Sequence, residues 1–95
     1  MPHKAHMTFR LEKTRSGSVT TVRLIGRLRS EHVEELRKHL EHEGAELVVD
    51  LSEVSLVDRE VVRFLIVCEN QGVEIVNTSP YIRKWMQRER EEPEF

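Results

Sequence analysis

Apolar and polar positions are distributed along the chain in a pattern that predicts four short strands and three helices. The clearest elements lie in the middle. Residues 46–51 form an apolar run rich in β-branched side chains, which is typical of a strand covered on both faces. After a short loop, residues 61–68 are apolar nearly all round and long enough for a buried helix. Asp58 is placed to cap this helix, because its oxygens can accept the free amide hydrogens of the first turn.

Upstream of this pair, the alternation of apolar and polar residues at 8–12 predicts a strand with one exposed face, and residues 19–28 are expected to form a second strand. The turn between them, residues 14–18, contains Gly17, which tolerates positive φ. The two strands are therefore expected to form a hairpin. Gly26 interrupts the second strand and indicates a bulge or a close backbone approach.

The first helix is expected to be amphipathic. Ser30 should cap it, and Gly44 should end it as a residue in the left-handed conformation. Its apolar side chains, Val33, Leu36 and Leu40, share one stripe, while charged residues occupy the other positions. This pattern predicts a helix that lies on the surface of the domain.

The C-terminal third contains two more elements. Residues 70–72 close the middle helix with a glycine, and residues 73–77 are expected to form the last strand. Ser79 should then cap the third helix, with Pro80 in its first position, where a missing amide hydrogen is tolerated. The run 88–92 is expected to be a solvated charged stretch. The apolar stripe of this helix consists of Tyr81, Ile82, Trp85 and Met86.

The resulting order, β-β-α-β-α-β-α, predicts a single small α/β domain with a mixed four-stranded sheet and three helices. The last three strands are separated by helices, so they should pair in parallel through right-handed crossovers. The first strand should pair antiparallel at one side. We expect the domain to span residues 8–90, with a mobile leader at 1–7 and a frayed tail at 91–95.

Composition narrows the class of protein. A chain of 95 residues suits one domain, and its formal net charge of −2 argues against a nucleic-acid binder that works through bulk positive charge. Cys68 is the only cysteine, which excludes an intrachain disulfide. No apolar run is long enough to span a bilayer, and the N-terminus does not have the pattern of a secretory signal. We therefore expect a cytoplasmic protein without direct membrane insertion.

Catalytic and metal-binding chemistry has weak support in the sequence. His39 and His42 share a helix face, with His32 nearby and Glu43 adjacent, but no paired motif supplies a full set of zinc ligands. Asp50 and Asp58 flank the central loop and could act as an acid and a base. No positioned histidine or nucleophile accompanies them. The sequence thus favours a protein that is not an enzyme and has neither a metal nor a cofactor.

Two features leave alternatives open. Arg59 lies in the first turn of the middle helix, where the helix dipole disfavours a cation. It is either paired with its charged neighbours or displayed to an acidic partner. Tyr81 and Trp85 either pack against the sheet or, together with Arg83 and Arg88, form a binding patch.

The segments 48–52 and 57–58, followed by the apolar helix, resemble the strand, Asp-Leu-Ser sequence and helix start of the STAS domain (sulphate transporter and anti-sigma factor antagonist). Residues 26–28 look like the Gly-Arg-Leu/Phe-Asp strand end of that family, and residues 72–81 like its Gly-x-x-Leu-x-x-x-x-x-Ser-Pro segment. The resemblance covers approximately residues 19–85.

The resemblance implies a bacterial interaction domain that acts in transcription regulation and binds an anti-sigma factor or a kinase-like regulator. In the family, the serine after the aspartate at the helix start is phosphorylated, which adds charge and blocks docking. Here that position holds Arg59, and Glu60 and Val61 follow it, so the phosphorylation switch is lacking. The predicted partner-binding residues are Ser55, Asp58, Arg59, Glu60 and Arg63.

Two alternative functions remain. One is a small STAS subunit of a membrane transport complex, because the chain resembles short STAS domains with that role. The other is a small metal-dependent enzyme that uses Asp50 and Asp58. An unpaired strand at the sheet edge could also support a dimer.

Overall fold

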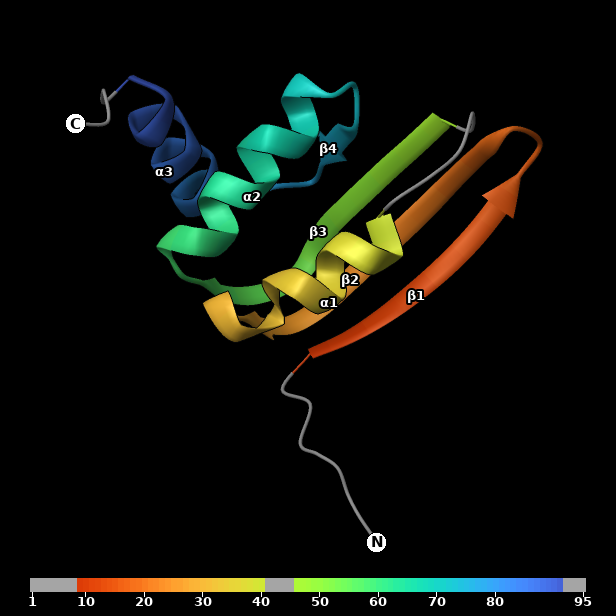
Figure 1. Ribbon diagram of the computed structural model, residues 1–95, viewed down its shortest axis with the longest axis horizontal. Coiled ribbons are helices and arrows are strands. Elements are labelled where there is room, and N and C mark those ends of the chain that lie inside the picture. Colours follow the sequence, from red (N-terminus) through yellow and green to blue (C-terminus); the bar gives the residue numbers. More distant parts are fainter. Residues whose placement is uncertain (1–8, 41–45, 92–95) are drawn as a thin grey trace, which may run out of the picture.

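The structure is a computed structural model that describes residues 9–40 and 46–91. It contains one mixed four-stranded sheet, and the helices lie against one of its faces (Figure 1). The predicted leader at 1–7, Gly44 and the end of the predicted tail lie outside the described residues. The elements are β1 (Phe9–Ser16), β2 (Val19–Leu28), a 3-10 turn (Ser30–His32), α1 (Val33–Leu40), β3 (Glu46–Val57), α2 (Arg59–Asn70), β4 (Glu74–Val76) and α3 (Pro80–Glu91).

The strands are arranged in the spatial order β1-β2-β3-β4. β1 and β2 form the expected antiparallel hairpin, in which Gly17 has a positive φ of 64°. The predicted turn at 14–18 is too long, because β1 stays paired with β2 through Ser16. β2 pairs in parallel with β3, and β3 with β4, so Val22 lies opposite Val49, which in turn lies opposite Ile75. The predicted fold class and strand pairing are confirmed, because strands joined by helices return in the same direction.

β3 differs from the prediction. The expected loop at residues 52–57 continues the strand, which has twelve residues instead of six. Two register shifts in its pairing with β2 accommodate the extra length, one of them beside Gly26. Gly26 has a φ of 105°, which confirms the predicted irregularity. The polar residues of 52–57 suggested a loop because the second half of β3 is mostly exposed. Exposed strands tolerate serine and glutamate, so polarity did not separate strand from loop here.

The first helix starts differently from the prediction. Ser30 does not cap it. Instead, Ser30 lies in the 3-10 turn, and its backbone N–H donates to Asp58 Oδ2 at 2.7 Å. The predicted stripe on α1 is confirmed, because Leu36 and Leu40 are buried and Val33 packs against them.

α2 begins and ends as predicted, with Asp58 as its cap and Gly72 at a φ of 98° after its last turn. The prediction of a buried helix holds for one face only, since Val67 is 49% exposed. Burial follows one face only, because a two-layer domain covers a helix from the sheet side and leaves the opposite side open. The buried residues of α2 are Val61, Val62, Leu65 and Cys68.

α3 also begins as predicted, with Ser79 Oγ accepting from the Ile82 N–H at 3.2 Å and Pro80 as the first helical residue. Ile82 and Met86 join the core, whereas Tyr81 is 56% exposed. The expectation of a solvated charged run at 88–92 fits Arg88, Arg90 and Glu91, which are exposed, but it is wrong for Glu89, whose side chain is only 10% exposed. α3 continues through Glu91 and packs against α2.

Candidate functional site

The start of α2 is held in place by Asp58, whose carboxylate accepts two backbone hydrogen bonds. Oδ1 accepts from the Val61 N–H at 3.2 Å, which caps the helix. Oδ2 accepts from the Ser30 N–H at 2.7 Å, which links α2 to the turn that follows β2. One side chain therefore sets the position of the helix start relative to the sheet.

Arg59 and Arg63 lie one helical turn apart, and both contact the same carboxylate on α3. Arg59 Nε lies 3.3 Å from Glu89 Oε2, and Arg63 Nε lies 3.2 Å from Glu89 Oε1. Of the two interpretations of Arg59, pairing with its sequence neighbours is wrong, because its partner lies thirty positions away. Its side chain nevertheless remains 56% exposed, so one edge of the guanidinium is held and the remainder faces outward.

Glu89 is the shared ion-pair partner of Arg59 and Arg63. The hydrogen bond from Arg63 lowers the pKa of Glu89, partial burial opposes that change, and Arg59 and a hydrogen bond from Trp85 lower the pKa further. The net effect is a pKa below the ordinary value, so the carboxylate stays ionised at neutral pH. Trp85 thus combines a packing role against the core with a polar contact to the cluster.

The remaining predicted partner-binding residues surround this cluster in sequence. Glu60 is exposed in the first turn of α2. Ser55 is exposed near the end of β3 and is followed by Leu56, which is 41% exposed. We call the set Ser55, Asp58, Arg59, Glu60 and Arg63 the α2 surface. It presents charges of both signs next to an exposed leucine.

A groove of about 460 Å³ adjoins the α2 surface and shares Glu60 and Arg63 with it. Its floor includes Phe64, with the Arg37 guanidinium 5.7 Å from the ring centre. The other lining residues are Val33, Val67, Cys68 and Gln71. Burial raises the pKa of the Cys68 thiol to about 11, with a small opposing effect of Arg37. The thiol is therefore protonated and unsuited to nucleophilic chemistry at neutral pH.

Asp50, the other carboxylate considered for catalysis, accepts hydrogen bonds that fix the local structure. Its Oδ1 accepts from the Ser52 N–H at 2.9 Å and from Asn77 Nδ2 at 3.1 Å. Burial raises the pKa of Asp50, but these hydrogen bonds outweigh burial and hold it below its ordinary value. Asn77 has a positive φ of 59°, a conformation that asparagine tolerates better than most residues. Asp50 and Asp58 thus both accept hydrogen bonds that fix the local structure.

The histidines of the first helix are also engaged. His32 Nδ1 accepts from the Arg29 N–H at 3.0 Å, and its ring centre lies 4.6 Å from that of Phe9. His39 Nε2 lies 3.4 Å from a Glu35 oxygen. Within residues 9–40 and 46–91, no group of three side chains is arranged to hold a metal ion. His42 and Glu43, the remaining members of the suggested cluster, lie outside the described residues.

The rings of Tyr81 and Trp85 on α3 lie 5.8 Å apart between centres and are tilted by 58° relative to each other. The two alternatives for this pair both apply in part, because Trp85 packs against the core and Tyr81 is largely exposed. In the part of the chain that the structure describes, no helix is long and apolar enough to cross a membrane.

The fold and the capped helix start can now be compared with known proteins. The family model described as "Mlab, STAS domain" matches residues 11–88, so the chain belongs to this family of STAS domains. Among solved structures, an antisigma-factor antagonist, the STAS domain from Rhodobacter sphaeroides, has a TM-score of 0.64 at 22% identity, covering 74% of this chain and 87% of that chain. At this identity, the likeness is one of fold. The comparison with curated proteins gives no match.

Sequence reasoning identified Asp58, Arg59 and Arg63 but missed Glu89. The one available signal was its heptad-like position on α3, since Glu89 follows the buried Ile82 by seven residues and lies on a nearby face. Its location within a charged run hid this spacing. Asn77 was also missed, because its side-chain contact with Asp50, inside β3, depends on which strands are neighbours.

Proposed function

We propose that this protein is a non-catalytic interaction module that binds a partner protein through the α2 surface. The observation that carries the proposal is the pairing of Arg59 and Arg63 with Glu89. Glu89 holds the long side chains of Arg59 and Arg63 in place at the exposed start of α2, before any partner binds. Their pairing reduces the conformational entropy lost on docking, and arginine is among the residues that most often dominate interface energies.

We further propose that this docking is not controlled by phosphorylation at the helix start. The resemblance to the STAS family places the phosphorylated serine at the position of Arg59, and arginine cannot accept a phosphate at a hydroxyl. Its charge is also opposite in sign and is already partly compensated by Glu89. A surface without this switch is suited to constitutive binding.

For the partner, we propose an anti-sigma factor or a kinase-like regulator, as suggested by the fold shared with the Rhodobacter sphaeroides antisigma-factor antagonist. A second candidate is a stable subunit role in a membrane transport complex. The same observation favours it, because a docking surface that lacks a switch suits a permanent assembly.

The test is co-purification from cells that express the full chain, followed by identification of bound proteins. Arg59→Glu reverses the exposed charge and places a second carboxylate beside Glu89. We expect at least a tenfold loss of the specific partner, in line with the cost of removing a charged interface contact. Arg15→Glu, at an exposed position on β1, is the matched control and should retain the partner.

The identity of the retained protein separates the two candidates. An anti-sigma factor or kinase-like protein supports the first, and an integral membrane complex supports the second. Equal recovery of one specific partner by wild type, Arg59→Glu and Arg15→Glu would exclude the α2 surface as the docking site. Far-ultraviolet circular dichroism of each variant establishes that loss of binding is not loss of fold.

A further inference from the structure

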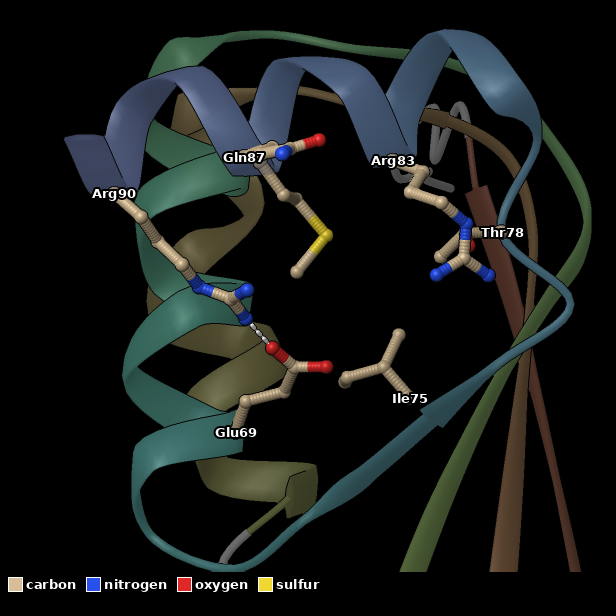
Figure 2. A pocket seen from close by; sticks show the side chains of 7 residues that line it. Glu69, Ile75, Thr78, Arg83, Gln87 and Arg90 are labelled. Carbon is tan, nitrogen blue, oxygen red and sulfur yellow. Dashed lines mark ion pairs between the residues drawn. The ribbon is translucent and has the colours of Figure 1, made fainter. Parts of the chain in front are cut away.

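A second concave site lies toward the C-terminal end of α2, between that helix, β4 and α3 (Figure 2). It encloses about 250 Å³. None of its lining residues belongs to the α2 surface. They are Glu69, Ile75, Thr78, Arg83, Met86, Gln87 and Arg90. The volume is slightly below the range of about 300–1,000 Å³ that is usual for drug-sized ligands, so the pocket suits a small metabolite.

The side chains that line this pocket carry a net positive charge. Arg90 reaches across from α3 and forms an ion pair with Glu69 on α2, marked by the dashed line in Figure 2. Arg83 extends from α3 into the same space, and its guanidinium forms no ion pair with any residue in 9–40 or 46–91. The pocket thus contains two cations and one carboxylate, and one cation is uncompensated. A planar guanidinium in this situation favours a phosphate or carboxylate, which it can bind through two parallel hydrogen bonds.

A polar group on the same side of the pocket also lacks a partner. Thr78 Oγ1 is buried and has no hydrogen-bond partner among the described residues. A buried hydroxyl without a partner costs free energy that a hydrogen bond to a ligand oxygen would recover. Figure 2 shows Arg83 extending toward the side of the pocket where Thr78 lies. The unpaired cation and the unsatisfied hydroxyl therefore belong to one end of the cavity.

The opposite end has different chemistry. Figure 2 shows Glu69 away from Arg83 and Thr78, and its carboxylate can accept hydrogen bonds from hydroxyl groups. Ile75 and Met86 add apolar surface to the lining of the pocket. We propose that this pocket binds a small hydroxylated organic anion. Its phosphate or carboxylate group is bound by Arg83 and receives a hydrogen bond from Thr78, and its hydroxyl groups donate to Glu69. Binding requires the exposed Arg83 side chain to turn onto the anion and open access to the threonine hydroxyl.

The test is an NMR titration of the full chain, labelled with nitrogen-15, with four probes: glycerol 3-phosphate, glycerate, glycerol and inorganic phosphate. Saturable shifts at residues 75, 78 and 83–90 with glycerol 3-phosphate or glycerate, and weaker binding of glycerol and inorganic phosphate, would support the proposal. Which of the two organic anions binds more tightly identifies the preferred head group. Absence of saturable shifts with both organic anions, or equal affinity for inorganic phosphate, would overturn it.

Three variants locate the binding. Arg83→Gln should weaken the affinity at least tenfold, because it removes a charge-assisted contact. Thr78→Val keeps the side-chain shape and should weaken the affinity severalfold. Arg88→Gln is on the same helix but does not line the pocket, so it should leave the affinity unchanged. If Arg83→Gln and Arg88→Gln bind alike, the proposal is wrong. These measurements use no protein partner, so their result does not depend on the function of the α2 surface.

Discussion

At the scale of single residues, Asp58 connects two elements that are distant in sequence. Most helix caps satisfy amides of their own helix, whereas this carboxylate also accepts from Ser30, which precedes α1. Loss of the side chain therefore removes hydrogen bonds in two places, at Ser30 and at Val61.

We predict that Asp58→Ala lowers the free energy of unfolding by about 2 kcal/mol, the upper end of the range for helix caps. Ser79→Ala, which removes only the cap of α3, should cost about 1 kcal/mol. Urea unfolding of the two variants and wild type measures both values. Asp58→Asn keeps a carbonyl oxygen for the cap and should fall between Asp58→Ala and wild type. A stability of Asp58→Ala equal to that of wild type would contradict the two-bond role.

Glu89 gives a prediction for the pH dependence of stability. The folded state holds the pKa of Glu89 below its ordinary value of 4.5, while the unfolded chain should titrate near that value. The group therefore stabilises the fold fully above pH 4.5, and this contribution is lost as the pH falls through the lower pKa of the folded state. Glu89→Gln removes the titration, since a neutral amide does not ionise.

The measurement compares urea unfolding of wild type and Glu89→Gln across acidic and neutral pH. Wild type should be the more stable of the two above pH 4.5, and the difference should shrink as the solution becomes more acidic. A difference that grows on acidification would have the wrong sign and would contradict the assigned role of the two arginines.

At the scale of elements, α2 has two faces with different roles. Leu65 is fully buried against the sheet, whereas Val67 is 49% exposed beside the groove. We predict that Leu65→Ala lowers the free energy of unfolding by about 2–5 kcal/mol, because it removes buried contacts and leaves a cavity. Val67→Ala should change it by no more than about 0.5 kcal/mol, as is usual for surface substitutions.

Chemical denaturation of these two variants checks the orientation of α2 directly. Equal costs at the two positions would mean that the helix is rotated from the described orientation. The exposed apolar side chain at position 67 is consistent with a surface available for contacts, since an isolated exposed valine contributes little to the fold itself.

At the scale of the whole molecule, the reactivity of Cys68, the only cysteine in the sequence, measures global unfolding. Cys68 is 5% exposed, and burial raises its pKa to about 11, so the reactive thiolate is scarce in the folded state. We predict that alkylation by iodoacetamide at about pH 8 proceeds through unfolding and accelerates steeply with urea. Leu65→Ala should accelerate it in buffer. Labelling of native wild type at the rate of the fully unfolded chain would contradict this expectation.

Much of the fold could be predicted because it depends on local patterns. The caps at Asp58 and Ser79 and the glycine stop at Gly72 follow from local chemistry, and the strand and helix periods follow from the apolar positions. The length of β3 could not be predicted in this way. Its second half pairs with β2 through a shifted register, and such pairing is decided by a neighbouring strand rather than by local composition.

The candidate site shows the same division. The sequence by itself determined that Asp58 begins a helix, that Arg59 follows it and that no hydroxyl stands at that position. Only the tertiary structure decided that Glu89 holds both arginines, that Ser30 donates to the cap and that Arg83 enters a pocket with Thr78. The physical reason is the sequence distance over which each kind of interaction acts. Backbone preferences act within a few residues, whereas ion pairs and pockets form between side chains that meet only when helices pack on the sheet.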